Sequence, residues 1–458
     1  MAGMLAARAL ANVFENVVVL ERDALPEGPE PRPGVPQAKH LHALLPRGRR
    51  ILESYFPGIT AQLKGSGAEM LDIAKDIAWL TPQGWGVRFA SEFEGLSSTR
   101  MLLETAVRIR LKKLLNIKLL PNCEVTGLVG DARRIDGVRF HLRGEEAGGA
   151  ELKADLVVAA TGRHSVVSKW LRELEMPEAE TTCINAHVGY ASRMYRRPER
   201  STSDWRAIFL QAAPPDYKRA GILFPVEGNR WLVTLQGGDR DYPPTDEAGF
   251  LEFVRGLRSP ILYDAIRDAV PLSDISSYRA TENRLRHFER LQEWPEGLVT
   301  MGDAVCAFNP VYGQGMTTAA LAAEELERCV KSGESTTKMT RLFQKRLARI
   351  NRAAWMLATG EDLRYVGVEG AMADGSAKRM HFYVDHVLSA ATHNISVRRS
   401  FLSVQGMLNG PEAIFRPAVV LQVAREAWRK NWSKAKQAES GLLAMPRQMN
   451  AIRGGERA

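Results

Sequence analysis

Apolar runs and helical patterns alternate along two parts of the chain, residues 1–175 and 286–350. Short apolar runs of the kind that form buried parallel strands occur at Val17–Leu20, Ile117–Leu120, Leu156–Ala160 and Leu298–Met301, and Cys123–Val129 adds a further strand. Two helices are predicted beside these runs. Met1–Asn12, before the first run, is rich in Ala and Leu, and a later helix is indicated by the helical spacing of Leu102, Leu103, Val107, Leu111 and Leu115. This alternation predicts an α/β domain built on a parallel sheet.

A different pattern fills residues 176–285. Turn clusters at 212–216 and 227–229 separate short runs of Val, Ile, Leu, Phe and Tyr, which predicts an antiparallel sheet. Its expected strands are Ala186–Met194, Trp205–Gln211, Ala220–Pro225 and Trp231–Gln236. Beyond residue 350 the pattern is helical again, interrupted by a loop at Gly360–Ala377.

These patterns divide the chain into three regions and a tail. We expect one domain from residues 1–80, 98–175 and 286–350, and an antiparallel-sheet domain from a short excursion at 81–97 together with 176–285. A helical region should follow at 351–440, and a basic tail, expected to be disordered, at 441–458.

Composition narrows the class of protein. With 458 residues, 45% of them hydrophobic and 25% charged, the chain can bury two cores. It has neither an apolar run of eighteen residues nor a basic-then-apolar secretion signal, so a cytoplasmic location is expected. The four cysteines lie far apart without metal-ligand spacing, which favours reduced thiols and no metal site.

The net charge of +9 is concentrated near the carboxyl end. Within Ala418–Lys436, helical spacing places Val420, Ala424, Trp428 and Trp432 on one stripe, with basic residues largely elsewhere. Such a stripe either packs on its own domain or rests on an anionic membrane. No nucleic-acid-binding motif accompanies the charge, so no nucleic-acid partner is expected.

The segment Gly297–Ala320, GLVTMGDAVCAFNPVYGQGMTTAA, carries the clearest chemical signal. An apolar strand leads to Gly302 and Asp303, whose carboxylate suits a ribityl or ribose hydroxyl, and Pro310 stiffens the loop that follows. Gly313 and Gly315 let the backbone approach a flat ring, and the helix that starts near Met316 offers free N–H groups. Since reduced flavin is negative at its pyrimidine end, the segment suits a flavin. The alternative is an ordinary strand, loop and helix.

These residues resemble the second flavin fingerprint of the class A flavoprotein monooxygenases, the group of para-hydroxybenzoate hydroxylase. Residues 1 to about 350 follow the order of segments in that family and look closest to its polyether polyketide epoxidases. The resemblance implies a Rossmann-like FAD-binding domain of the GR2 type, an inserted antiparallel-sheet substrate domain and a C-terminal helical region. It is specific for the cofactor and weak for the substrate.

The amino end departs from the family pattern. Glu21 lies eighteen residues after Gly3, close to the spacing at which an acidic residue holds the adenosine ribose, and Arg22 follows it. Gly3 then matches the last glycine of a G-x-G-x-x-G/A loop whose first strand and earlier residues are absent. We expect a gap at the centre of the sheet. Either the given sequence starts about ten residues late, or the gap is real and the chain binds flavin poorly.

The resemblance also assigns residues downstream. It places Arg32, in a proline-rich loop, at FAD or pyridine-nucleotide phosphate, Arg100 at the FAD phosphates or ribityl chain, and Val125 at the adenine. A solvated surface arginine is an equal alternative for Arg100. His40 and His42 are poorly spaced for a metal, and either a polar surface role or a role in proton movement near the ring is open to them. No catalytic base can be named with conviction.

Two more features bear on partners and substrate. Thr161-Gly162-Arg163 stands where hydroxylating members have Asp-Gly, which puts the pyridine-nucleotide contact in doubt; Arg163 is either a phosphate ligand or a salt-bridged structural residue. In the family the antiparallel sheet covers the reactive face of the flavin. The pocket-wall candidates there are Tyr190, Met194, Phe209, Phe224 and Trp231, each of which is alternatively plain core.

The resemblance implies an enzyme in which NAD(P)H reduces FAD, O₂ adds at flavin C4a, and the C4a-hydroperoxyflavin transfers an oxygen atom to an alkene or electron-rich ring. We expect a hydrophobic polyene, polyketide or aromatic substrate, and a monomer or homodimer. The W-x-W-x-I-P signature of flavin halogenases is absent. A prenyl-chain reductase and a truncated flavin-binding protein without catalysis remain as alternatives.

Overall fold

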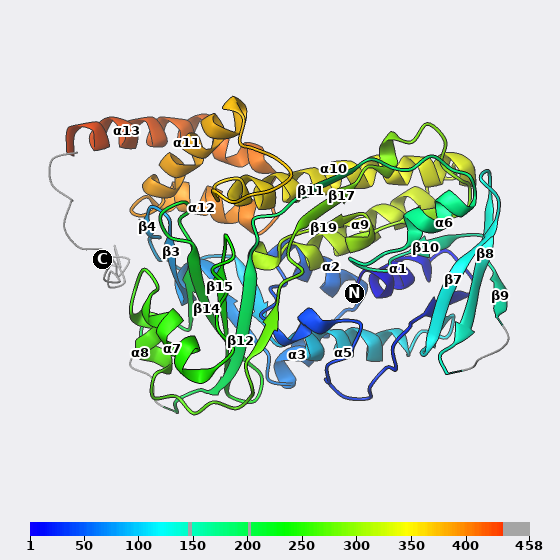
Figure 1. Ribbon diagram of the computed structural model, residues 1–458, viewed down its shortest axis with the longest axis horizontal. Coiled ribbons are helices and arrows are strands. Elements are labelled where there is room, and N and C mark those ends of the chain that lie inside the picture. The colour runs from blue at the N-terminus through cyan, green and yellow to red at the C-terminus, as the bar shows by residue number, and fades with distance from the viewer. Residues whose placement is uncertain (145–148, 200–202, 434–458) are drawn as a thin grey trace, which may run out of the picture.

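The computed structural model of the protein describes residues 1–144, 149–199 and 203–433. Figure 1 shows an elongated molecule with the amino terminus near its middle and the C-terminal helices at one end. The expected basic tail at 441–458 lies outside the described residues.

Two short parallel sheets form the centre of the first domain. β1 (Val17–Leu20) pairs with β6 (Ile117–Leu120), and β10 (Val157–Ala159) pairs with β18 (Leu298–Thr300). Within the described residues no ladder joins β1 to β10. Helices pack around these strands: α1 (Ala2–Leu10), α2 (Pro46–Tyr55), α3 (Ile59–Gly65), α5 (Arg100–Leu111), α6 (Val167–Glu173), α9 (Gly315–Val330) and α10 (Thr336–Asp362).

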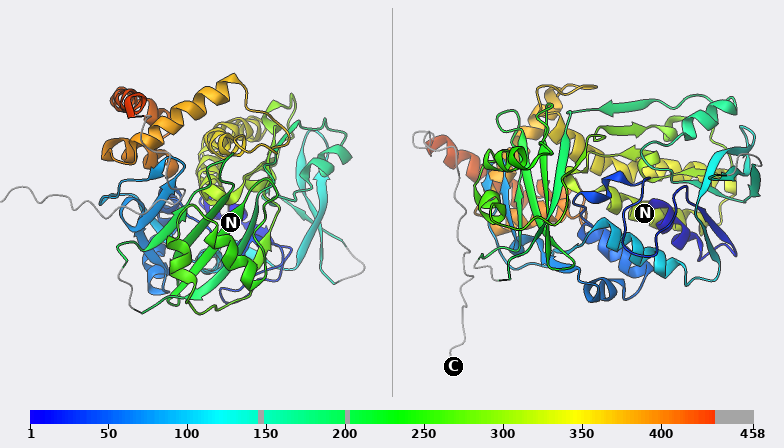
Figure 2. Two further views of the ribbon diagram at one scale, coloured as in Figure 1. Left: turned by 60° about the vertical axis from the view of Figure 1, so that its left-hand side comes forward. Right: turned by 60° about the horizontal axis from the view of Figure 1, so that its bottom comes forward.

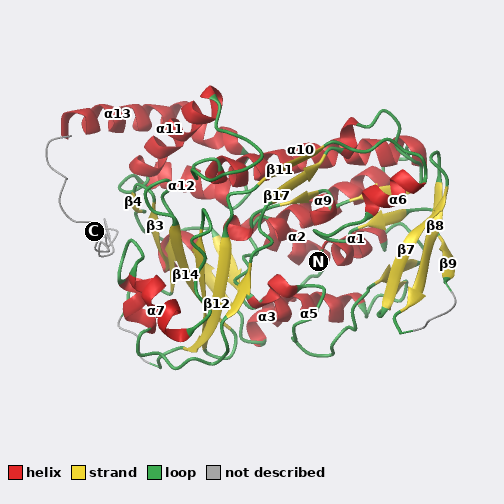
Figure 3. Ribbon diagram, viewed as in Figure 1, coloured by secondary structure: helices red, strands yellow, loops and turns green. Residues whose placement is uncertain are grey.

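Two antiparallel sheets complete this domain. The first is a three-stranded meander at one end of the molecule (Figure 3), made of β7 (Cys123–Gly130), β8 (Ile135–Leu142) and β9 (Ala150–Lys153). The second, which connects to the substrate domain, joins β11 (Thr181–Ile184), β17 (Asn283–Arg286) and β19 (Cys306–Ala307). The parallel strands and the strand at Cys123 were all predicted from the sequence.

A seven-stranded sheet forms the second domain. It contains the four expected strands as β12 (Gly189–Arg196), β13 (Ala207–Leu210), β14 (Arg219–Val226) and β15 (Arg230–Gly237), together with β16 (Ser276–Tyr278), β3 (Ile77–Thr81) and β4 (Gly84–Trp85). β3 pairs in parallel with β13, Ile77 opposite Ala207, while β2 (Glu69–Asp72) pairs with β5 (Glu94–Ser97) beside it. The boundary at residue 81 was therefore wrong, because the excursion already includes β3.

Side chains alternate across this sheet and separate its two faces. Ala78, Leu80, Ile208, Leu223 and Leu235 pack against α7 (Glu247–Arg255) and α8 (Ile261–Ile266) on one face. Ile77, Trp79 and Phe209 point to the other, where the C-terminal helices lie. This period-two alternation leaves one apolar face of the sheet available to line a cavity.

The C-terminal region consists of α11 (Gly375–Ala390), α12 (Ile395–Gln405) and α13 (Pro417–Ser433), which lie together above the sheet (Figures 1 and 2). α10 runs without a break from Thr336 to Asp362, so the expected boundary at residue 350 falls inside a helix. The long helix thereby connects the first domain directly to the C-terminal region.

Candidate active site

The loop after β18 brings an unpaired carboxylate to the amino ends of two helices. Gly302 has φ +65, and a Cβ added to it would lie only 2.7 Å from the Cβ of Ala2 at the start of α1. Asp303 follows, and within the described residues no group donates a hydrogen bond to its carboxylate. Burial raises the pKa of Asp303, and the charges of Arg163 and Arg100 oppose this shift. This half-buried acceptor without a donor suits a polyol hydroxyl, and the helix amino ends beside it suit an anionic group.

Farther along the loop, one position requires a residue without a side chain and the next carries a buried amide without a hydrogen-bond partner. Gly313 has φ +66, and a Cβ there would lie 2.8 Å from the Cβ of Ala43. Gln314, directly before α9, is 2% exposed, yet its side-chain Oε1 and Nε2 have no hydrogen-bond partner in the described protein. The first turn of α9, at Gly315 and Met316, therefore presents free N–H groups next to an orphaned amide, which fits a polar ring edge.

Arg32 lies in a cluster of acidic residues rather than in an open phosphate site. Its guanidinium lies 3.0 Å from Glu21, 3.2 Å from Asp23 and 2.7 Å from Glu104, measured between nitrogen and oxygen. Arg100 lies 3.4 Å from the other oxygen of Glu104. Burial alone would raise the pKa of Glu104, but the charges of the Met1 amino group, Arg100 and Arg32 hold it at about 2.

This cluster places the other predicted residues of the amino end. Glu21 directly follows β1 and is about one-third exposed, which leaves part of its carboxylate open, and Arg22 is exposed to solvent. Gly3 lies in α1 against Ala160, since its added Cβ would be 3.6 Å from that side chain. Val125 lies in β7 at a shift in register. The structure thus brings Gly3, Arg32, Arg100 and Asp303 together around the amino end of α1, with Val125 on the neighbouring meander.

The two histidines line a cavity beside the loop. The Nδ1 of His40 lies 2.8 Å from the Ser192 hydroxyl, which in turn lies 2.7 Å from that of Thr234. His42 Nδ1 lies 3.0 Å from the carbonyl oxygen of His40. Burial, with the nearby charge of Lys39, lowers the pKa of His40 to about 4, and burial with Arg100 lowers that of His42 to about 3. Both imidazoles are therefore neutral at pH 7.

The cavity encloses about 1250 Å³ including its mouth and runs from the loop to α12. Pro310, Val311 and Gly313 form one end, and Leu402, Gln405 and Gly406 at the end of α12 form another wall. None of the described residues that line it is Asp, Glu, Lys or Arg. An uncharged wall of this size favours a neutral, largely apolar molecule.

The predicted pocket wall divides according to strand register. Tyr190, Phe209 and Phe224 line the cavity. Trp231 does not, because it lies opposite Pro225 and points into the core on the other face of the sheet. Met194 lies near the far end of β12, beside Ser273. The assignments of Met194 and Trp231 to the pocket wall were therefore wrong.

Several residues missed by the sequence analysis belong to the site. Ile77 and Trp79 come from β3, and the apolar run IAWLT at 77–81 was a signal for a strand there. Leu402 and Gln405 carried no such signal, because only the tertiary packing of α12 brings them to the cavity. Arg163 donates to the carbonyl oxygens of Phe308 at 2.7 Å and Glu282 at 2.5 Å, which is the structural role weighed for it above.

The predicted stripe on the C-terminal helix faces solvent. Val420 is 40% and Trp428 67% exposed, and Ala424 is exposed as well, whereas Val419 and Val423 are the buried positions of α13. The side chain of Trp432 lies outside the described residues. The described ranges contain no helix that is both long and apolar enough to cross a bilayer, and no cluster of three metal-ligating side chains.

Comparison with known proteins identifies the family. A family model described as an FAD binding domain matches residues 104–331. Protein Rv3254 of Mycobacterium tuberculosis is 30% identical over 379 residues, which cover 80% of this chain and 78% of that protein. The chain belongs to the class A family of FAD-dependent monooxygenases. It is accordingly an FAD-dependent oxidoreductase, and the unpaired Asp303, the glycine positions and the amino ends of α1 and α9 suit that cofactor.

Solved structures share the fold of this flavoprotein. p-Nitrophenol 4-monooxygenase PnpA from Pseudomonas putida aligns with a TM-score of 0.60 at 20% identity over 90% of this chain and 96% of its own. The flavin-dependent brominase Bmp2 aligns with a TM-score of 0.66 at 12% identity over 94% and 97%. Because one is a monooxygenase and the other a brominase, the fold alone does not select between these reactions.

Proposed function

We propose that this flavoprotein uses NAD(P)H and O₂ to insert one oxygen atom into a neutral, hydrophobic molecule. The reaction is epoxidation of an alkene or hydroxylation of an electron-rich ring, in a polyene, a polyketide or an aromatic compound. One observation carries the proposal: an uncharged cavity connects the flavin loop to the apolar face of the seven-stranded sheet.

The residues of the first domain bind and orient the cofactor. Asp303 would accept a hydrogen bond from a ribityl hydroxyl, and the free N–H groups at Gly315 and Met316 would hold the polar edge of the ring. The amino end of α1 lies beside Gly302, where its N–H groups suit a phosphate. When bound, FAD supplies the reducing electrons and the activation of O₂, so the protein itself needs no nucleophile.

The cavity residues position the substrate and exclude water. Trp79, Phe209 and Phe224 supply the apolar wall. Exclusion of water by this wall protects the activated oxygen from side reactions. His40, Tyr190 and Tyr278 are the neutral polar groups near one another on the wall, with ring centroids of His40 and the two tyrosines 6.2 and 5.8 Å apart. They suit a hydroxyl or carbonyl oxygen of the substrate rather than a carboxylate.

The direct test combines cofactor and substrate classes. The purified chain with FAD should oxidise NADH or NADPH faster when neutral polyenes or phenols are added, and mass spectrometry should find ¹⁸O from ¹⁸O₂ in the product. Phe224→Asp should abolish the substrate effect, because it buries a charge in the cavity wall, while Phe382→Asp, at a position 67% exposed, should not. Stimulation by small phenolic acids alone would contradict the proposed substrate class.

A prenyl-chain reductase is the second candidate, because the same uncharged cavity suits a prenyl chain. A reductase would form a product without oxygen from O₂ and would work under anaerobic conditions with reduced FAD. The ¹⁸O₂ experiment therefore separates the two functions. A flavin-binding protein without catalysis would bind FAD and show neither product.

We further propose that the C-terminal region rests on an anionic lipid surface. Of the nineteen large apolar side chains exposed in the described chain, ten lie between Met356 and Trp428, and the exposed Arg416 and Arg425 lie on or beside α13 with them. The protein should cosediment with vesicles that contain phosphatidylserine more than with phosphatidylcholine alone. Trp428→Glu should weaken this binding and Leu115→Glu, in the first domain, should not; equal binding by both variants and the wild type would refute it.

A further inference from the structure

A closed polar cluster lies behind the flavin loop. The Tyr190 hydroxyl donates to Asn309 Oδ1 at 2.6 Å, and Asn309 Nδ2 donates to the two carboxylate oxygens of Asp362 at 3.0 and 3.2 Å. Asn283 Nδ2 donates to Asp362 Oδ2 at 2.6 Å, and its Oδ1 accepts from the backbone N–H of Asn309 at 2.7 Å. All four side chains are at most 5% exposed, and they come from β12, β17, the loop before Pro310 and the end of α10.

We infer that Asp362 is a positioning residue of the active site, which orients the Asn309 amide and thereby fixes both the flavin loop and the Tyr190 hydroxyl on the cavity wall. This inference rests on the proposed function of the cavity. The single side-chain amide of Asn309 holds both the Tyr190 hydroxyl and the flavin loop. Its Oδ1 accepts from Tyr190 and, at 3.4 Å, from the backbone N–H of Val311, while its Nδ2 has only Asp362.

The carboxylate decides which end of the amide faces the loop. A carboxylate only accepts hydrogen bonds, so it attracts the NH₂ end of Asn309 and leaves the oxygen for Tyr190 and Val311. A side chain that also donates would compete with that arrangement. Reversal of the amide would set its NH₂ against the backbone N–H of Val311, next to Pro310 at the end of the cavity, and disturb the loop.

Asp362 is not neutralised by a cation. Its hydrogen bonds come from amides, and no ion pair of the described chain includes it. The charged residues nearby interact with other groups. Arg364 lies 3.3 Å from Glu361 and 3.0 Å from Asp385, and Arg163 donates to the carbonyl oxygen of Phe308. Burial raises the pKa of Asp362 to about 7, against the two asparagine hydrogen bonds.

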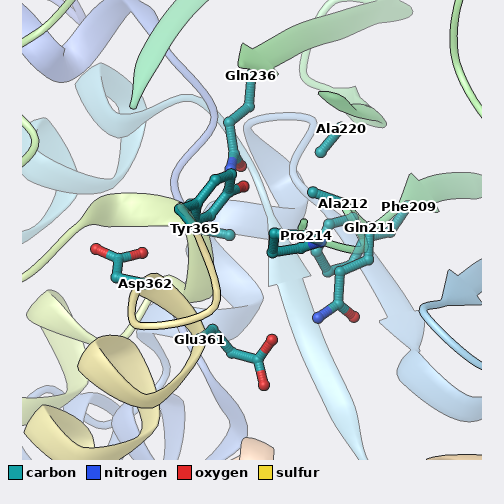
Figure 4. A pocket seen from close by; sticks show the side chains of 10 residues that line it. Phe209, Gln211, Ala212, Pro214, Ala220, Gln236, Glu361, Asp362 and Tyr365 are labelled. Carbon is teal, nitrogen blue, oxygen red and sulfur yellow. The ribbon is translucent and has the colours of Figure 1, made fainter. Parts of the chain in front are cut away.

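A narrow chamber, about 300 Å³ including the open solvent at its mouth, adjoins this carboxyl group (Figure 4). Glu361 and Asp362 at the end of α10 line it, together with Tyr365 in the turn that follows and Gln236, whose side chain ends beside the Tyr365 ring. Phe209 and Val311 line both the chamber and the substrate cavity. Asp362 therefore borders a second space, which meets the substrate cavity at Phe209 and Val311 and whose lining includes the carboxyl group.

The test follows the bound flavin as a reporter of the loop. In the wild-type FAD complex, the visible absorption and the flavin fluorescence should change between pH 6 and 8 as one proton is bound. Asp362→Asn should abolish this transition and bind FAD about tenfold more weakly, the effect expected for one lost buried interaction. Glu361→Gln, which lines the same chamber without contacting Asn309, is the matched control. It should retain the transition but move it to lower pH, because the charge of Glu361 raises the pKa of Asp362.

The outcomes separate this inference from the proposed function. A transition that persists unchanged in Asp362→Asn, or one that is missing from the wild type, would overturn the role of Asp362 even if the enzyme oxygenates its substrate. Loss of the transition in Asp362→Asn supports that role even if no oxygenated product is found. If Asp362→Asn does not fold, Tyr190→Phe and Asn309→Leu provide the test: the first should retain the flavin transition and the second should lose it.

Discussion

Arg32 offers the sharpest test of how the structure differs from the sequence-based assignment. In the structure the Arg32 side chain, 9% exposed, lies between the carboxylates of Glu21, Asp23 and Glu104. Arg32→Met keeps the approximate length of the side chain and removes its charge. The three carboxylates would then face one another with less compensation, so we expect the folded state to be destabilised whether or not FAD is bound.

The size of the effect follows from Glu104. Its pKa is held at about 2 against an ordinary value of 4.5, and this difference corresponds to about 3 kcal/mol shared among its positive neighbours. Loss of one partner of a buried ion pair costs about 3–5 kcal/mol in general. Because the folded-state pKa is depressed, this stabilisation is present above pH 4.5 and is lost as the pH falls toward 2.

The assay is urea unfolding of wild type and Arg32→Met at pH 7, with and without excess FAD. We expect the free energy of unfolding to fall by about 3 kcal/mol in both conditions. Arg134→Met is the control, because Arg134 also pairs with two carboxylates but is exposed, and it should change little. Unchanged stability together with a large loss of FAD affinity would refute the ion-pair reasoning and restore Arg32 as a phosphate ligand.

Three further predictions concern single side chains. Gly313→Ala should weaken FAD binding measured by fluorescence titration, since the added Cβ meets Ala43 at 2.8 Å and φ is +66; unchanged affinity would contradict the close approach. Asp362→Asn should flatten the pH dependence of the free energy of unfolding. The folded-state pKa of Asp362 is raised from 3.8 to about 7, so the wild type should lose at most about 4 kcal/mol of stability relative to the variant as the pH rises through that window. Parallel stability curves for the two proteins would contradict this prediction. Arg398→Met should leave the melting temperature unchanged or raise it, because burial without an ion-pair partner in the described residues lowers the pKa of Arg398 to about 9; a large drop would show that its stacking on Trp79 outweighs the buried charge.

Local patterns predicted the parts of the fold that depend on local chemistry. Apolar runs marked the parallel strands β1, β6, β10 and β18. Asp303 and Gly313 were found because a Gly-Asp and a pair of glycines have few other uses at that spacing. In the structure they lie near the amino ends of α1 and α9, and their contact with a cofactor stays a prediction.

Tertiary contacts account for what the sequence did not reveal. Phe224 and Trp231 look equivalent as aromatic residues in neighbouring strands, but the register that pairs Trp231 with Pro225 sends their side chains to opposite faces. Asn283, Asn309 and Asp362 meet only because β17, the flavin loop and the end of α10 converge. A single apolar or polar residue carries no sign of a partner that distant in the chain.

The central claim is that this chain binds FAD and passes oxygen from O₂ to an apolar substrate. The most direct measurement is the visible spectrum of the purified chain with FAD, followed by NAD(P)H oxidation with and without O₂. Flavin bands of a bound cofactor and oxygen-dependent consumption of NAD(P)H, increased by a neutral polyene or phenol, are the expected result. Absence of bound flavin at excess FAD, or NAD(P)H oxidation that is independent of O₂, would contradict the account.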